Sequence, residues 1–555
     1  MLQKKSATDS AAAMIDTVGR ILTPTEPFGP RASESLFHAD LRGTDILFDR
    51  SNLIYAQAVG RSRPAYIVGR KGAGKTAFLR SSASSGGRPQ VVLETATVYS
   101  EMAAALRHYT TARGPLFVPQ VADVWLALFE HVALYYAVDT MSGDDPPHEL
   151  QTLWDYLSAT PDWGADATTV SQRYLAELER RIDDRSIHGL TEVIDGMSRG
   201  GIAFAEVRKA LCTLLSRRES QMVIVMDNLE DLHAQLPQLD TVLAGLFHAV
   251  GVIVNERSAA HPFTTQLCLP SELWDRLHLV SANPEKDFGG NYLTLYWSAR
   301  ELLHLVGSRY QLFMEIHHPA ELDELRRRCQ DDGSGIALLR ASLPGTIQGG
   351  LGILEDPVAY LLRHTQLLPR HLIEILNSVF TAAVPGSTPW AITPDAIRVG
   401  TRSGERIVIE GIFAAHRASF PEAPAVLRRL VNRLAISFPA RELRKVFNRE
   451  GIKKVLPGDF DDFMEMLIAM GVLGVKVGQT AKYNKAKFQY TFESSLNALE
   501  DQDELCFHPL FTRYLFEQSI DRQRQAHQLP TYPFGTDPAD HDYRDQIYRI
   551  ASQAA

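Results

Sequence analysis

An α/β fold with a parallel sheet is the fold class that this sequence predicts. Short, β-rich apolar runs occur at residues 65–68, 91–93, 223–226 and 265–269, and helix-forming stretches separate them. Strands buried on both faces of a sheet read as continuous apolar runs, and helices usually connect parallel strands. The first run ends at Gly69 and helix formers follow it, which gives a strand, a turn and a helix. We therefore expect a parallel sheet with helices on both faces.

Length and composition indicate a large globular protein of several domains. The chain has 555 residues, of which 45% are hydrophobic and 22% charged, so a wholly disordered chain is excluded. The formal net charge of −9 argues against a uniformly basic nucleic-acid coat, although it allows a local basic face. The four cysteines are far apart and form no zinc or disulfide pattern, which favours a reducing compartment. With no secretory signal and no uninterrupted spanning segment, we expect a cytoplasmic protein without a membrane partner.

A phosphate-binding loop is the clearest motif. Residues 69–76 satisfy the pattern GxxxxGK[ST], directly after a β run and directly before a helix. Phosphate needs several convergent backbone N–H donors, and glycines let the loop turn tightly enough to aim them inward. Lys75 is expected to reach the β and γ phosphates, and the Thr76 hydroxyl to bind Mg²⁺. The sequence thus predicts a site for ATP and Mg²⁺ formed by Gly69, Arg70, Lys71, Gly72, Ala73, Gly74, Lys75, Thr76 and Ala77.

An acidic residue, Asp227, follows the apolar run Met222–Met226. This is the form expected of a Walker B strand, and Asp227 is predicted to bind the Mg²⁺ through water. The alternative is that Asp227 caps a helix that begins at Asn228. The P-loop upstream favours the metal role, because the metal in such sites bridges the nucleotide phosphates.

Three segments together, residues 69–76, 222–230 and 367–373, resemble the AAA+ and STAND-like side of the P-loop ATPases. More closely, they resemble bacterial ATPases akin to the archaeal and eukaryotic origin-recognition initiators, over roughly residues 40–515. Members of the bacterial group often lie beside mobile-element or phage-defence genes. The resemblance implies a P-loop NTPase core with a helical lid, and ATPase activity.

The resemblance also implies roles for individual residues. Asn228 stands where many AAA+ ATPases carry a glutamate that polarises the attacking water, so either Glu230 serves or hydrolysis is slow. Arg370 matches an arginine that begins a lid helix and reaches the γ-phosphate, the alternative being an exposed arginine at a helix start. Ser271 stands at the polar sensor position, and Trp297 is expected to be a core or hinge residue. An arginine acting on a neighbouring subunit is expected among Arg257, Arg276, Arg300 and Arg309.

Changes in pattern along the chain predict its domains. Residues 1–40 are an irregular arm rich in Pro and Gly, and residues 521–555 are a polar tail that is partly mobile. Between them we expect a P-loop ATPase core at 41–318 with a helical insertion at about 100–215, a helical lid at 319–400, and a winged-helix-like domain at 401–520. The last assignment rests on helices at 425–436, 440–450 and 459–470, followed by a hairpin at 473–477 and 488–492.

Charge is segregated onto this C-terminal domain. Residues 417–490 carry fourteen basic and seven acidic side chains, a local charge of +7 against −16 for the remainder. Such a domain would contact double-stranded DNA with one helix and its wing, where four lysines stand: Lys476, Lys482, Lys485 and Lys487. The alternatives are that these charges are merely solvated, or that the domain binds protein.

Two functions from different classes follow. The first is an AAA+-like ATPase that couples its nucleotide state to DNA or to a partner protein, in phage defence or mobile-element biology. The second is a STAND-like switch with slow hydrolysis that controls assembly with an effector protein. We expect a homo-oligomer in both cases.

Overall fold

The computed structural model describes residues 16, 18–31, 47, 64–80, 89–141, 147–159, 166–183, 189–216, 222–227, 240–255, 263–273, 279–281, 283–329, 334–383, 392–417, 419–449, 451–488, 503–516 and 528–537. The chain forms two compact units. The sheet unit comprises Ile54–Arg70 and Lys75–Leu295. The C-terminal unit comprises Met1–Leu53, Lys71–Gly74 and Tyr296–Ala555, so it includes the middle of the P-loop.

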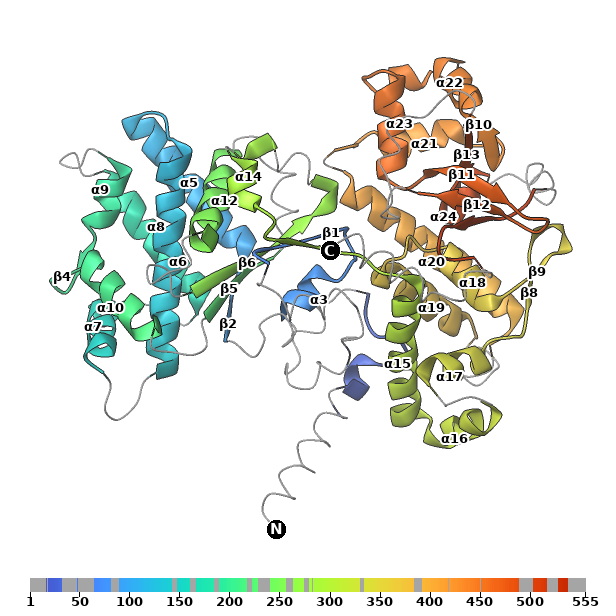
Figure 1. Ribbon diagram of the computed structural model, residues 1–555, viewed down its shortest axis with the longest axis horizontal. Coiled ribbons are helices and arrows are strands. Elements are labelled where there is room, and N and C mark those ends of the chain that lie inside the picture. The colour runs from blue at the N-terminus through green and yellow to red at the C-terminus, as the bar shows by residue number, and fades with distance from the viewer. Residues whose placement is uncertain are drawn as a thin grey trace, which may run out of the picture. The chain divides into compact units, whose positions relative to one another are not determined.

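The sheet unit contains a parallel five-stranded sheet, which confirms the predicted fold class (Figure 1). Its strand order is β2-β5-β6-β1-β7, and every neighbouring pair is parallel. The strands are β1 (Tyr66–Gly69), β2 (Gln90–Leu93), β5 (Met222–Met226), β6 (Phe263–Pro270) and β7 (Tyr292–Leu295). β1, which leads into the P-loop, is therefore separated from β5, which leads into Asp227, by one inserted strand.

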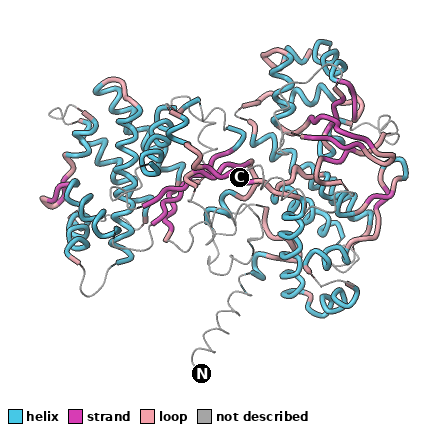
Figure 2. The backbone as a smooth tube through the Cα atoms, viewed as in Figure 1, coloured by secondary structure: helices cyan, strands magenta, loops and turns pink. Residues whose placement is uncertain are grey.

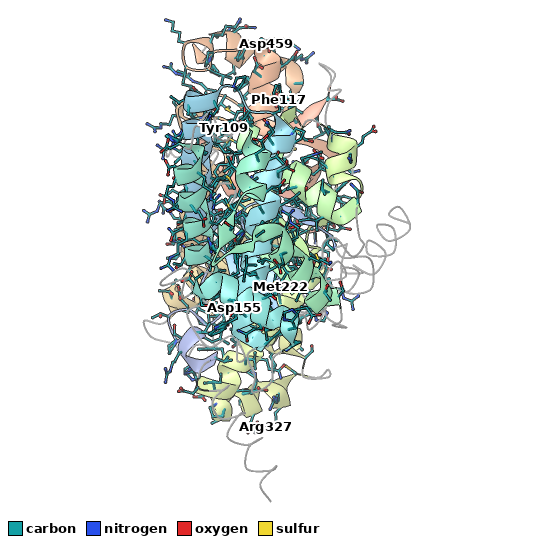
Figure 3. All side chains as sticks on the ribbon, turned by 90° about the vertical axis from the view of Figure 1, so that its left-hand side faces the viewer. Tyr109, Phe117, Asp155, Met222, Arg327 and Asp459 are labelled. Atoms are coloured by element: carbon teal, nitrogen blue, oxygen red, sulfur yellow. The ribbon has the colours of Figure 1, made fainter. Side chains whose placement is uncertain are left out.

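The helices of this unit pack against the sheet or against one another, and most of them contribute residues to its buried core. They are α3 (Lys75–Arg80), α5 (Thr95–Arg113), α6 (Val118–Met141), α7 (His148–Ser158), α8 (Ala167–Ile182), α9 (Leu190–Asp195), α10 (Phe204–Ser216), α12 (Asp240–Asn255) and α14 (Pro284–Phe288). Figure 3 shows Tyr109 of α5 and Phe117, directly before α6, at the same end of this helical group. Trp125 and Phe129 of α6 belong to the same buried cluster as Ile224 of β5. The expected helical insertion thus spans α5 to α10, with a short hairpin of β3 (Ser198–Arg199) and β4 (Ile202–Ala203), and is continuous with the core of the sheet.

Within the described residues, one helix is long and apolar enough to cross a membrane. This helix is α6, and 78% of its most apolar window is buried inside the protein. Its indole at Trp125 donates a hydrogen bond to the backbone carbonyl of Val242 at 3.1 Å. The apolar character of α6 is therefore accounted for by packing in the core.

The C-terminal unit begins with helices that hold a segment of the N-terminal arm. These helices are α15 (Ala299–His317), α16 (Pro319–Arg328), α17 (Gly335–Ser342), α18 (Pro357–Arg363), α19 (Pro369–Ala383) and α20 (Pro394–Ala415), with a hairpin of β8 (Ile347–Gln348) and β9 (Leu354–Glu355). Phe28 of the arm is buried, and its N–H donates to Asn377 Oδ1 at 3.1 Å. Arg309 donates to the Phe28 carbonyl at 2.8 Å. The described part of the arm is thus packed on α15 and α19.

A second sheet follows, with the order β10-β13-β11-β12-β14. Its strands are β10 (Ser437–Pro439), β11 (Leu473–Gln479), β12 (Asn484–Lys487), β13 (Glu504–Phe507) and β14 (Thr531–Pro533). Figure 2 shows them as one magenta group bordered by helices. The helices are α21 (Ala423–Leu430), α22 (Ala440–Arg449), α23 (Phe460–Ala469) and α24 (Pro509–Leu515). The order of elements here is α21, β10, α22, α23 and the hairpin β11–β12, and the winged-helix-like assignment of this domain stays a prediction.

Two expectations in this region are corrected, and a third concerns residues of which the structure describes only part. The helix expected at 425–436 ends at Leu430, because Asn432 takes a left-handed backbone conformation (φ 60°) and its N–H donates to the Leu515 carbonyl at 2.9 Å. The second hairpin strand is 484–487, since the turn closes early through a hydrogen bond from Thr480 N to Tyr483 O at 2.8 Å. Residues 489–492 lie outside the described residues. Part of the expected polar tail, 528–537, is packed: β14 pairs in parallel with β12 and Tyr532 is buried.

Candidate nucleotide site

The P-loop leaves β1 and enters α3 through a tight turn. Gly72 and Gly74 have φ values of +94° and +90°, a region that L-residues with a side chain rarely adopt. These two glycines of the motif are therefore the ones that the backbone requires. Lys75, the first residue of α3, is buried, and its ammonium donates to the carbonyls of Gly69 at 2.8 Å and Arg70 at 3.3 Å. The ammonium thus lies folded over the start of the loop, and Thr76 follows it in the first turn of α3.

Two residues of the C-terminal unit bind consecutive carbonyls of this turn. The indole N–H of Trp297 donates to Ala73 O at 2.8 Å, and the backbone N–H of Arg370 donates to Gly72 O at 3.4 Å. A Cβ built on Gly72 would lie 3.0 Å from the Cβ of Arg370. The Arg370 side chain in turn donates from Nε to the carbonyl of Arg31 at 3.2 Å. Arg370 is therefore in contact with the P-loop, and Trp297, which was expected to be a core or hinge residue, holds the loop directly.

Asp227 lies at the carboxyl end of β5, at the sheet edge where β1 ends and the P-loop begins. Its side chain is buried, with 7% of the residue exposed. Its backbone N–H donates to the hydroxyl of Thr95 at 3.0 Å. This bond ties the end of β5 to Thr95, the first residue of α5, which follows β2 after one intervening residue.

Glu94 is a residue that the sequence reasoning missed. The last pair in the β2–β5 ladder is Leu93 with Met226, so Glu94 and Asp227 follow it at the same level on neighbouring strands. Glu94 is exposed, whereas Leu93 before it and Thr95 after it are buried. The Glu94 backbone N–H donates to the Thr168 hydroxyl at 3.4 Å. The signal in the sequence was an acidic residue that ends an apolar run, the same signal that identified Asp227.

The remaining predicted residues fall into three groups. Asn228, Glu230, Arg257 and Arg276 lie outside the described residues. Ser271 begins the short 3₁₀ helix after β6, and the residue before it, Pro270, pairs with Gly69, so Ser271 lies at the P-loop edge of the sheet. The expectation that Arg309 is a candidate to act on another subunit is corrected. Its guanidinium is buried and donates to the carbonyls of Phe28 and Leu47, so it cannot reach another subunit. Arg300 is half-buried in the first turn of α15.

The four lysines of the predicted wing are mostly engaged within the C-terminal unit. Lys476 pairs with Glu504, and Lys485 Nζ lies 2.9 Å from a carboxylate oxygen of the buried Asp537. The ammonium of Lys487 lies 5.4 Å from the centre of the Phe534 ring. Lys482, in the turn of the hairpin, is exposed. The wing therefore presents less basic charge to a partner than the sequence suggested.

The parallel sheet with one strand inserted between β1 and β5, together with the glycine turn before α3, defines an α/β P-loop NTPase fold. No protein-family model matches the sequence, and no curated protein is significantly similar to it. Among solved structures, the chain is similar to the Aeropyrum pernix ORC2 protein in its ADPNP–ADP complexes, with a TM-score of 0.37 and 13% identity over 85% of this chain and 90% of that one. It is also similar to the Aeropyrum pernix ORC1 protein in complex with DNA, with a TM-score of 0.29 and 12% identity over 87% and 94% of the two chains.

Proposed function

We propose that this protein binds ATP with Mg²⁺ at the P-loop and hydrolyses it, and that its nucleotide state controls engagement of DNA or of a partner protein. The observation that carries the proposal is the pair of features at one edge of the parallel sheet. One is the start of the P-loop after β1, where the Lys75 ammonium donates to the carbonyls of Gly69 and Arg70, and the other is the buried Asp227 after β5. Such an arrangement places phosphate donors and a metal-binding carboxylate on the same side.

The side chains and backbone groups of the loop are of the kinds that bind a nucleoside triphosphate. Residues 69–77 provide backbone N–H donors, and Lys75 provides an ammonium already directed at the loop by its bonds to Gly69 and Arg70. The Thr76 hydroxyl and the Asp227 carboxylate are oxygen ligands of the kind that Mg²⁺ prefers. When bound, ATP–Mg²⁺ supplies the phosphoryl group and the charge that neutralises its oxygens.

Hydrolysis needs a group that accepts a proton from water. Asn228, directly after Asp227, can orient water but is a poor proton acceptor, so a carboxylate must serve. Glu94 and Glu230 are the two candidates, and Glu94 is favoured by its place beside Asp227 in the strand register. Its exposed side chain is compatible with contact to a water molecule.

Arg370 is proposed to bind the γ-phosphate and to transmit its presence to α19. The contact between Arg370 and Gly72 supports this role, since it already lies against the turn that would hold the phosphates. A guanidinium can donate two hydrogen bonds to phosphate oxygens at once. We expect Arg370→Ala to lower hydrolysis more than nucleotide affinity, and a pure loss of binding would argue against this role.

A second candidate is a nucleotide switch of the STAND-like type, in which slow hydrolysis resets assembly with an effector protein. The neutral Asn228 after Asp227 favours it, because the position most suited to a base carries an amide. In both cases we propose a homo-oligomer, with Arg257, Arg276 and Arg300 as the candidates to act across subunits. A setting in phage defence or mobile-element biology belongs to the same proposal.

One experiment tests the nucleotide site and separates the two candidates. ATP affinity and phosphate release are measured with and without duplex DNA for the parent, Lys75→Ala and Asp227→Ala. We expect Lys75→Ala to lose affinity and Asp227→Ala to lose turnover by at least about 100-fold. Equal binding and hydrolysis by all three proteins would refute the site. Release stimulated by DNA supports the coupled ATPase, and tightly retained nucleotide with little turnover supports the switch.

A further inference from the structure

An exposed basic face runs along α22, the second helix of the winged-helix-like domain. The side chains of this face are three and four residues apart in the sequence, which places them on one side of the helix. Leu443 and Phe447 on the opposite side are buried in the domain core. All members of the face are exposed: Arg441, Arg444, Lys445, Asn448 and Arg449. From its first to its last member the face is about 12 Å long, at about 1.5 Å of rise per residue.

Further basic residues extend this face. Lys453 and Lys454 are exposed in the short 3₁₀ helix Ile452–Lys454 that follows α22. The guanidinium of Arg444 lies 4.2 Å from the centre of the Phe460 ring, and the ammonium of Lys453 lies 5.2 Å from that of Phe447. Stacking of this kind fixes the direction of a long side chain and so lowers the entropy lost when a partner binds. Glu442 is the acidic residue at the edge of the face.

The neighbouring helix has the opposite charge. α23, which in the usual docking of a winged helix would enter a groove of DNA, exposes Asp461, Asp462 and Glu465. Asp462 also closes the N-terminus of α23 by accepting a hydrogen bond from the backbone of Asp459 at 2.8 Å, so it cannot turn away freely. Three carboxylates brought against a phosphate backbone repel it. The hairpin offers little compensation, since Lys476 and Lys485 already pair with carboxylates of the same domain.

We propose that the phosphate backbone of duplex DNA is bound by α22 together with Lys453 and Lys454, and that α23 and the hairpin face away from it. This inference rests on the proposed engagement of DNA and names its surface. The length of the basic face, about 12 Å, is similar to the width of the major groove, so one helix can reach the phosphates that border it. The α22 face therefore supplies the electrostatic contact that the acidic α23 cannot.

The test compares three charge changes on the full chain. The probe is a fluorescent duplex of mixed sequence, titrated over a range of salt concentrations with ATP present. Arg441→Glu with Lys445→Glu is expected to weaken binding by at least about tenfold and to reduce the slope of log K against log salt by about 2. The matched control on α23, Asp461→Lys with Glu465→Lys, is expected to bind as tightly as the parent or more tightly. Lys482→Glu in the hairpin should change the affinity by less than about threefold.

The outcomes distinguish a failure of the α22 assignment from a failure of the proposed binding of DNA. If the parent binds no duplex with or without ATP, both the proposed binding of DNA and its assignment to the α22 face are refuted. If the parent binds and the α22 variant binds equally well with the same salt slope, only the assignment to α22 falls. Loss of binding to polyglutamate in the α22 variant, with DNA binding retained, would assign the face to an acidic protein instead. Circular dichroism and ATP affinity check that each variant is folded. The neutral variant Arg441→Gln with Lys445→Gln should also weaken DNA binding, but by less than the change to Glu.

Discussion

Glu94 and Asp227 follow neighbouring strands, and we propose that Glu94 is the base of the site and Asp227 a metal ligand. We expect Glu94→Gln to keep the affinity for ATP and to lower turnover by about 100-fold or more, because the amide retains the shape but accepts no proton. Single-turnover phosphate release together with equilibrium nucleotide binding measures both quantities. Glu230→Gln is the matched comparison. If Glu94→Gln keeps normal turnover and Glu230→Gln loses it, the general base is Glu230 and not Glu94.

Trp297 is a positioning residue, since it holds the P-loop and not the reacting atoms. Replacing it with Phe keeps an aromatic ring but leaves the buried carbonyl of Ala73 without its indole donor, a loss of about 1–3 kcal/mol. We expect nucleotide affinity to fall about tenfold, measured by titration with a fluorescent ATP analogue. Trp154→Phe, at an exposed position on α7, is the control and should leave the affinity unchanged. Equal affinities for the two variants would mean that the bond to Ala73 does not order the loop.

His131 of α6 is expected to make the stability of the helices around it depend on pH. Its ring is buried among Tyr156, Tyr174 and Phe204, and burial, with a contribution from Arg199, lowers its pKa to about 3. Its Nδ1 lies 2.7 Å from the Ala127 carbonyl, which fits a neutral ring that donates from Nδ1. The unfolded chain takes up a proton below about pH 6.5, so stability falls as the pH drops from there toward 3, by up to about 1.4 kcal/mol per pH unit.

The variant His131→Phe should remove this sensitivity. Urea unfolding between pH 6 and pH 4 is expected to show a steeper loss of stability in the parent than in the variant. The neighbouring Glu130, whose pKa burial raises to about 7, has the opposite dependence: its cost appears as the pH rises from about 4.5 to 7. Because Glu130 is present in both proteins, that contribution cancels to first order in the comparison. His148→Gln on the surface serves as control, and parallel slopes for parent and His131→Phe would contradict the account.

Among the elements, α19 and α20 cross so closely that glycine is required on α20. A Cβ on Gly400 would lie 2.3 Å from the Cα of Val379, and one on Gly404 would lie 3.0 Å from the Cα of Ile375. Gly400→Ala therefore forces the two backbones apart, and we expect a loss of about 2 kcal/mol or more in the free energy of unfolding. Gly411, in the same helix, has nothing within 4 Å of its Cβ position. Gly411→Ala should be neutral or stabilising by up to about 1 kcal/mol in the same urea titration. Equal effects at the two positions would show that the crossing can relax.

Most elements could be predicted because their patterns are local. The strands β1, β2, β5 and β6 appear as short apolar runs, and α22 and α23 as amphipathic stretches. The errors came where a distant contact decides the local structure. Asn432 ends α21 because its N–H bonds to Leu515, and β12 was placed too late because the apolar residues after 487 outweighed the turn at Thr480. Periodicity carries no information on such partners.

The candidate site divides in the same way. Lys75 and Asp227 follow from motifs, because phosphate and metal binding need particular residues next to particular elements. Glu94 and Trp297 could not be predicted, because their roles depend on which strands are neighbours and on which residues contact the loop. The strand order β2-β5 brings together residues that are 133 positions apart in the chain. Topology, rather than local sequence, thus selects the second carboxylate.

At the scale of the whole molecule, the chain's described C-terminal segment, residues 528–537, ties the winged-helix-like domain to the helices before it. Tyr532 of β14 donates from its hydroxyl to the buried carboxylate of Glu355, which also pairs with Arg363 at 3.2 Å. Five residues later, Asp537 accepts a hydrogen bond from Tyr483 at 3.1 Å and pairs with Lys485. The segment therefore joins β9 and α18 to β12 within the C-terminal unit.

Removing this segment should loosen the domain. A chain that ends after residue 527 leaves the outer edge of β12 without β14, and it leaves Glu355 buried with one donor fewer, at a cost of about 1–3 kcal/mol for that group alone. A chain that ends after residue 537 keeps every one of these contacts and is the matched control. We expect the shorter chain to unfold at lower urea concentration and to exchange the amide hydrogens of β12 faster, and Tyr532→Phe to shift both in the same direction by less. Equal unfolding midpoints and equal exchange rates for the two truncated chains would contradict this account.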